Sequence, residues 1–65
     1  MKEVTKEQFW EKINTSEKDI ISSSVGNWPY TNVFKYRYSR AEVGRIVQKK
    51  TDGGYPIVSD YYLTE

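Results

Sequence analysis

VFKYRYSRAEVGRIVQKK, residues 33–50, is the stretch that decides the predicted fold. Side-chain character alternates with a period of two from Val33 to Tyr38, as it does on the two faces of a β-strand. The SRAE segment at residues 39–42 is typical of a connection, and β-branched residues return between Val43 and Lys50. The stretch therefore predicts two antiparallel strands, at residues 31–39 and 43–50.

A third strand is predicted from the turn that follows. The TDGG segment at residues 51–54 is a strong hairpin signal, because Gly53 and Gly54 accept positive φ angles. Residues 55–63 then form the third strand of a meander. Pro56 has no N–H, so it fits best where that strand lies at a sheet edge.

The N-terminal segment carries the signals of a helix start. Thr5 and Gln8 have the spacing of a capping box, in which each side chain bonds the backbone N–H of the other. Val4 and Phe9 stand at the positions of a hydrophobic staple. A helix is therefore predicted to begin at Lys6.

The end of this helix is open to two interpretations. Apolar residues keep a roughly helical spacing from Phe9 through Ile13 to Ile20, which favours one helix over residues 6–22. The polar residues 14–16 interrupt that spacing, so the alternative is a helix to Ile13 and a separate turn. The serine-rich and glycine-containing segment 22–27 ends the helix in either case.

Together these elements predict an α+β fold, with an N-terminal helix packed on a three-stranded antiparallel β-meander. Sixty-five residues make a single small domain, residues 1–65. Aromatic residues, 15% of the chain, supply most of the apolar surface that such a small core needs.

The helix can cover only one face of the sheet, and the choice depends on register. If Tyr38 lies opposite Val43 and Lys50 opposite Tyr55, two faces result, and Arg45 pairs with Asp60 across the strands. The first face contains Phe34, Tyr36, Tyr38, Val43, Arg45, Val47, Val58, Asp60 and Tyr62. The second face contains Val33, Lys35, Arg37, Gly44, Ile46, Gln48, Ile57, Ser59, Tyr61 and Leu63.

The first face is favoured as the buried one. Burying Lys35 and Arg37 without partners would be costly, whereas their stems can lie along a rim with the charge in water. The alternative leaves the aromatic residues of the first face exposed, beside Arg45, where they could stack on unpaired bases. An apolar patch stays exposed in both cases, which predicts association with another molecule.

Catalysis and metal binding are not expected. The chain contains neither cysteine nor histidine, so the usual transition-metal ligands, thiol nucleophiles and imidazole bases are missing. No enzymatic activity, metal or cofactor is therefore predicted. The sequence has no apolar run that could span a bilayer and no apolar leader, so a cytoplasmic protein without membrane partners is expected.

Positive charge is concentrated in one part of the chain. The net charge is +1, yet residues 35–50 alone carry a net charge of +5. A local field of this kind favours an anionic partner. The predicted binding surface combines these cations with aromatic residues near element ends, and it consists of Trp28, Lys35, Arg37, Arg40, Arg45, Lys49, Lys50 and Tyr61.

Two functions follow from this surface. The favoured one is a non-enzymatic protein-interaction module, such as an inhibitor or accessory regulator of a larger protein machine, with a protein partner or a second copy of the chain. The alternative is a nucleic-acid-binding domain that uses the basic, aromatic hairpin.

Overall fold

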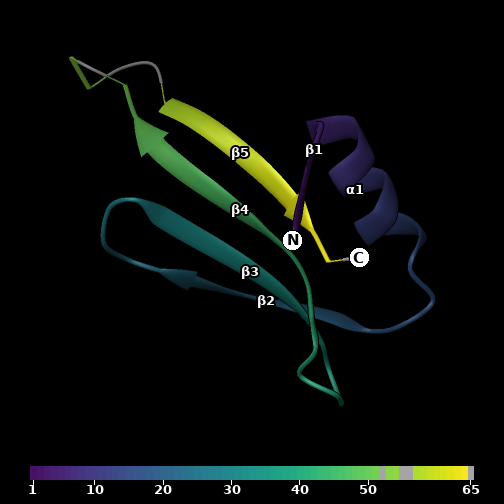
Figure 1. The fold of residues 1–65 in the computed structure, drawn as a ribbon. Helices are drawn as coiled ribbons and strands as arrows, with labels where there is room; N and C mark the ends of the chain where they lie inside the picture. Colours follow the sequence, from purple (N-terminus) through teal and green to yellow (C-terminus); the bar gives the residue numbers. More distant parts are fainter. Residues whose placement is uncertain (52, 55–56, 65) are drawn as a thin grey trace.

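The computed structural model describes residues 1–51, 53–54 and 57–64, and in it the chain forms one helix and a single antiparallel sheet (Figure 1). The elements are β1 (Lys2–Val4), α1 (Lys6–Thr15), β2 (Ile20–Val25), β3 (Tyr30–Tyr36), β4 (Glu42–Lys50) and β5 (Ile57–Leu63). The sheet has five strands in the order β1-β5-β4-β3-β2. The predicted three-stranded meander is therefore wrong, and the protein is mostly β with an N-terminal helix.

The start of α1 is confirmed. The Gln8 N–H donates to the Thr5 hydroxyl at 3.1 Å, and the Thr5 N–H donates to Gln8 Oε1 at 3.0 Å, which completes the capping box. The helix ends at Thr15, and Ser16 is already extended. The favoured prediction of a helix to residue 22 is wrong, and the shorter alternative comes within two residues of the observed end.

The residues beyond the helix form a strand that the sequence did not predict. β2 pairs antiparallel with β3, with Ile20 opposite Tyr36 and Val25 opposite Thr31. Ile20 packs against the core, so its apolar side chain contributes to the sheet and not to a longer helix. These residues form a strand because they pair with β3, about ten residues later in the sequence. This pairing outweighs the helical spacing of the apolar residues.

The connection between β3 and β4 is longer than predicted. β3 ends at Tyr36, whose N–H donates to the Ala41 carbonyl at 3.0 Å, and Arg40 adopts a positive φ of 56°. Tyr38 lies in this turn and is 87% exposed, so its predicted position opposite Val43 is wrong. Phe34 lies opposite Gly44 instead, and the register shifts between Phe34 and Lys35.

The hairpin between β4 and β5 follows the prediction more closely. Gly53 and Gly54 have φ angles of 92° and 89°, and the Gly54 N–H donates to the Thr51 carbonyl at 2.8 Å. Lys50 lies opposite Ile57, two residues from the predicted partner. A shift of two residues keeps every side chain on its predicted face. The predictions for Tyr55 and Pro56 fall outside the described residues.

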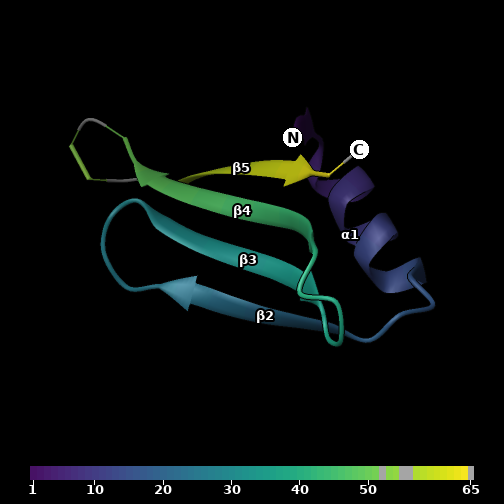
Figure 2. The ribbon, with the colours of Figure 1, turned by 60° about the horizontal axis from the view of Figure 1, so that its bottom comes forward.

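The core lies at one end of an elongated molecule, whose extents are 40 × 23 × 17 Å. α1 packs beside the chain termini, while the β2–β3 turn and the C-terminal end of β4 lie at the opposite end of the sheet (Figures 1 and 2). Phe9 is completely buried against Phe34 and Ile46. Partly buried side chains surround this cluster, and they are Val4, Trp10, Ile13, Ile20, Tyr61 and Leu63.

The helix covers neither of the two predicted faces as a whole. Phe34 comes from the first predicted face, whereas Ile46 and Tyr61 come from the second. The predicted pairing of β3 with β4 was wrong by an odd number of residues, and such a shift moves all side chains of one strand to the other face.

Candidate functional site

On the side of the sheet opposite α1, no helix or strand of the described residues covers the sheet, and we call this surface the open face. Its members follow from the register, since directly opposed residues share a face. The open face consists of Glu3 of β1, Ile21, Ser23 and Val25 of β2, Thr31, Val33 and Lys35 of β3, Glu42, Arg45, Val47 and Lys49 of β4, and Val58, Asp60 and Tyr62 of β5.

Aliphatic side chains are exposed to water on the open face. Ile21, Val25 and Val58 are 49%, 53% and 44% exposed, and all three come from β2 or β5, on either side of the central strands. Val33 and Val47 lie between them and are half-buried. Several exposed aliphatic side chains on one side of a sheet favour an interaction site.

The other side of the sheet has a different character where the helix does not reach it. There the strands present mainly polar side chains that water can solvate, and these are Ser22, Ser24, Asn32, Gln48 and Ser59. The Gln48 amide donates to the Ser59 hydroxyl at 3.4 Å across this surface. The same strands are thus mainly polar beside the helix, apart from Tyr30 and Ile57, and carry both aliphatic and charged side chains on the open face.

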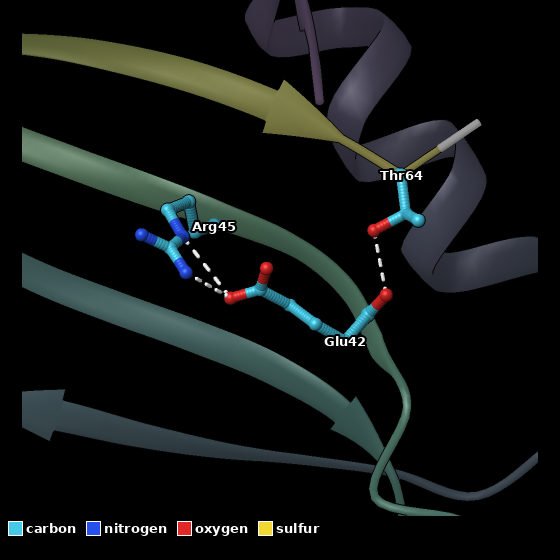
Figure 3. A network of polar contacts seen from close by, with 3 residues as sticks. All are labelled: Glu42, Arg45 and Thr64. Atoms are coloured by element: carbon cyan, nitrogen blue, oxygen red, sulfur yellow. Dashed lines mark hydrogen bonds and ion pairs between the residues drawn. The ribbon is translucent and has the colours of Figure 1, made fainter.

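Two of the predicted cations lie among the aliphatic residues of the open face, each with a carboxylate. The Arg45 guanidinium donates from Nε and Nη2 to Glu42 Oε1, at 3.0 and 2.6 Å (Figure 3). The Lys49 ammonium lies 3.6 Å from Asp60 Oδ2. The predicted pair of Arg45 with Asp60 is therefore wrong, because Arg45 lies opposite Tyr62 and Asp60 opposite Val47.

The Glu42 backbone also fixes the end of β5. Its carbonyl accepts a hydrogen bond from the Thr64 hydroxyl at 2.6 Å (Figure 3), and the Thr64 N–H donates to the Val43 carbonyl at 2.8 Å. Glu42 thus lies at the end of the open face where β4 begins. Its carboxylate accepts from the Arg45 guanidinium and so orients that side chain toward the start of β4.

Trp28 and Lys50 come together at the end of the sheet farthest from the helix. The Trp28 ring lies 4.2 Å from the Tyr30 ring between centroids, and the Lys50 ammonium lies 5.1 Å from the Trp28 centroid. Trp28, Pro29, Lys49 and Lys50 line a shallow hollow there. This aromatic and cationic tip borders the open face through Lys49.

Arg37 and Arg40 lie in the turn after β3, near the helix end of the sheet. The Arg37 N–H donates to the Asp19 carbonyl at 2.9 Å, and its guanidinium lies 3.8 Å from Asp19 Oδ2. Arg40 is exposed. These two cations are therefore separated from the Trp28 tip by the length of the hairpin.

Lys35 and Tyr61 complete the predicted set, and they lie on opposite faces. Lys35 is half-buried on the open face, opposite Ile21 of β2. The Tyr61 ring packs 5.5 Å from the Phe9 ring and forms part of the core. The eight predicted residues thus occupy four places: the open face, the tip, the turn and the core.

The exposed aliphatic residues of the open face were not predicted as site residues. Ile21 and Val25 could not be assigned to a face because β2 was not recognised as a strand. The signal that could have found the site is the alternation of Val47 with Gln48 and of Val58 with Ser59, which places valine and polar side chains on opposite faces.

The residues that the structure describes contain no cluster of acidic side chains suited to a metal ion. Within the same ranges, no helix has the length and apolar character to cross a membrane.

No protein-family model, no curated protein and no solved structure matches this chain. Its function must therefore be inferred from the geometry of the sheet.

Proposed function

We propose that this protein is a small non-enzymatic binding domain, which attaches to another protein through the open face of its sheet. The observation that supports the proposal is the contrast between the two sides of the strands. Where the helix leaves the sheet bare, the helix side is mainly polar, with Tyr30 and Ile57 as its exposed apolar residues, whereas the open face exposes Ile21, Val25 and Val58. Burial of apolar surface contributes about 25 cal/mol of favourable free energy for each Å² removed from water, so binding of a partner that covers these side chains is favoured.

The chemistry of the open face suits a partner with a flat aliphatic surface bordered by charges of both signs. Its apolar residues lie among Lys35, Arg45 and Lys49 and the carboxylates of Glu3, Glu42 and Asp60, and Arg45 and Lys49 already have a carboxylate partner within the chain. Inhibition or accessory regulation of that partner, in the cytoplasm, remains part of this proposal.

Nucleic-acid binding has weaker support. Single-strand binders stack bases on exposed aromatic rings, whereas Tyr62 is the aromatic residue that the described strands place on the open face, and it is half-buried. Arg37, Arg45 and Lys49 each have a carboxylate within 4 Å, which lowers the charge available to phosphates.

Two neighbouring residues allow a matched test. Ile57 and Val58 are 45% and 44% exposed in the same strand, but Val58 belongs to the open face and Ile57 points to the other side. Wild type, Val58→Asp and Ile57→Asp would be used to capture proteins from the producing cells. The captured protein would then be purified and its affinity for each variant measured by calorimetry.

The expected result is a protein that binds wild type and Ile57→Asp but loses at least about tenfold in affinity for Val58→Asp, since a carboxylate would be buried in the interface. Equal affinity for all three variants would contradict the proposal. An affinity for single-stranded nucleic acid that falls steeply with salt, with no protein captured, would favour the alternative.

A further inference from the structure

β2 forms one edge of the sheet. It pairs with β3 on one side, and none of the described residues forms a strand on its other side. An edge strand presents backbone N–H and C=O groups that can pair with another strand. This row of backbone groups is distinct from the open face, which is made of side chains.

The hydrogen-bond pattern identifies which groups point outward. The Arg37 N–H donates to the Asp19 carbonyl at 2.9 Å, at the position that continues the pairing of Ile20 with Tyr36. In an antiparallel pair, hydrogen-bonded positions alternate with non-bonded ones. Residues 21, 23 and 25 therefore bond to β3, whereas Ile20, Ser22 and Ser24 direct their backbone groups away from the sheet.

β2 lacks the features that usually protect an edge. Its six residues, IISSSV, include no charged residue and no proline, and every residue after Ile20 is exposed. Natural edges are commonly blocked by lysine, proline, a bulge or a very short strand. β2 is thus an accessible site for strand addition.

The opposite edge of the sheet is a much poorer partner. β1 has three residues, and two of them are Lys2 and Glu3. The Thr64 N–H bonds the Val43 carbonyl, so by alternation residue 62 also bonds β4, and residues 61 and 63 bond β1. Glu3 alone then directs its backbone groups outward from β1, and Ile57 and Ser59 of β5 direct theirs outward beyond the end of β1. This edge is therefore divided between two strands and offers β2 of a second copy no continuous row of groups.

We propose that two copies of this chain pair antiparallel through β2, with Ser22 of one copy opposite Ser22 of the other. The outward-pointing residues, at positions 20, 22 and 24, are symmetric about Ser22. In this register Ile20 lies opposite Ser24 of the second copy, and every outward N–H and C=O finds a partner. A two-fold axis through Ser22 thus makes β2 complementary to itself.

Side chains also favour a second copy. The strand is uncharged, so two copies bring no like charges together within it. At the two-fold axis the meeting side chains are those of Ser22, which are small. The axis is perpendicular to the sheet, so both helices lie on one side and the two open faces become continuous on the other.

Paired charge substitutions test this arrangement. Ser22→Lys places two ammonium groups opposite each other at the axis, and Ser22→Glu places two carboxylates there, so each variant alone is expected to dimerise at least about fivefold more weakly. An equimolar mixture of the two variants places a lysine opposite a glutamate, and we expect it to restore dimers. Sedimentation velocity over a range of protein concentrations measures all three samples. Asn14→Lys and Asn14→Glu, at an exposed position of α1, are the charge-matched controls and should dimerise like wild type.

Amide hydrogen exchange gives a second, independent measurement. In the paired form the amides of residues 20, 22 and 24 become protected, whereas dilution to the monomer exposes them and leaves residues 21, 23 and 25 protected by β3. Protection at every residue of β2 in the monomer would contradict the assignment of the edge.

The inference fails if wild type is a monomer at all concentrations up to the millimolar range, or if Ser22→Lys dimerises as well as wild type. Protection of the edge only in the presence of a different purified protein would assign it to a foreign strand and would also overturn self-pairing. These outcomes leave the open face untested, because Val58→Asp does not alter the edge of β2. The two proposals can therefore fail separately.

Discussion

The ring of Phe9 lies against the backbone of Gly44. A methyl group at this glycine would stand 2.6 Å from the Tyr62 carbonyl oxygen, closer than side-chain carbons approach in proteins, and 3.0 Å from Phe9 Cε2, closer than in most such contacts. Residue 44 therefore has no room for a side chain between the backbone of β5 and the helix. This contact joins the capped N-terminal half of α1 to the centre of the sheet.

Gly44→Ala is expected to lower the free energy of unfolding by about 1–3 kcal/mol, because the backbone of β5 cannot move away as a flexible side chain could. Urea denaturation followed by circular dichroism measures the loss. Gly26→Ala is the control, since no heavy atom lies within 4 Å of its added methyl group, and its stability should stay within about 0.5 kcal/mol of wild type. Equal effects of the two variants would contradict the close packing of Phe9 on Gly44.

Phe9→Ala is expected to cost about 3–5 kcal/mol, because Phe9 is completely buried and its ring contacts Trp10, Phe34 and Tyr61. A chain of this size has little stability to spare, so the variant should be largely unfolded at 25 °C. Thermal denaturation of Tyr38→Ala, which truncates a ring that is 87% exposed, supplies the comparison and should resemble wild type.

Thr5→Ala removes one half of the capping box and is expected to cost about 0.5–2 kcal/mol. Thr5→Ser retains the hydroxyl that accepts from the Gln8 N–H, so it should keep most of that stability. A double-mutant cycle of Thr5→Ala with Gln8→Ala isolates the coupling of the two side chains. Strict additivity would show that the two hydrogen bonds act independently.

Gly53→Ala and Gly54→Ala place a side chain at φ angles of 92° and 89°, which L-residues rarely adopt. Each is expected to cost about 1–3 kcal/mol, although the added methyl group meets no heavy atom within 4 Å. The loss should therefore come from backbone conformation and not from packing. Replacement of Gly53 by D-alanine in a synthetic chain should restore stability, and a failure to do so would point to a steric cause.

Local signals predicted the parts of the fold that depend on neighbouring residues. The capping box at Thr5 and the positive φ angles at Gly53 and Gly54 require only a few adjacent residues, and all were predicted correctly. The end of α1 was not, because Ile20 fits both a helical spacing and a strand. Only the pairing with Tyr36 decides between them.

The register between β3 and β4 could not be predicted from the sequence. The β3–β4 turn depends on Arg40 at a φ of 56°, an angle for which arginine gives no signal. The resulting error moved β3 relative to β4 and exchanged their faces. It hid the open face, since Val33 and Val47 were assigned to opposite sides of the sheet, whereas both lie on the open face.

The position of the core has a consequence for how the protein opens. Phe9 and its neighbours clamp one end of a molecule 40 Å long, while the far end of the β2–β3 hairpin is held by strand pairing and by the contact of Trp28 with Tyr30. Opening should therefore be graded along the sheet, with fraying that starts at Val25 and Tyr30 and stops before Phe34. The strand ends far from the helix can therefore separate while the core around Phe9 stays folded.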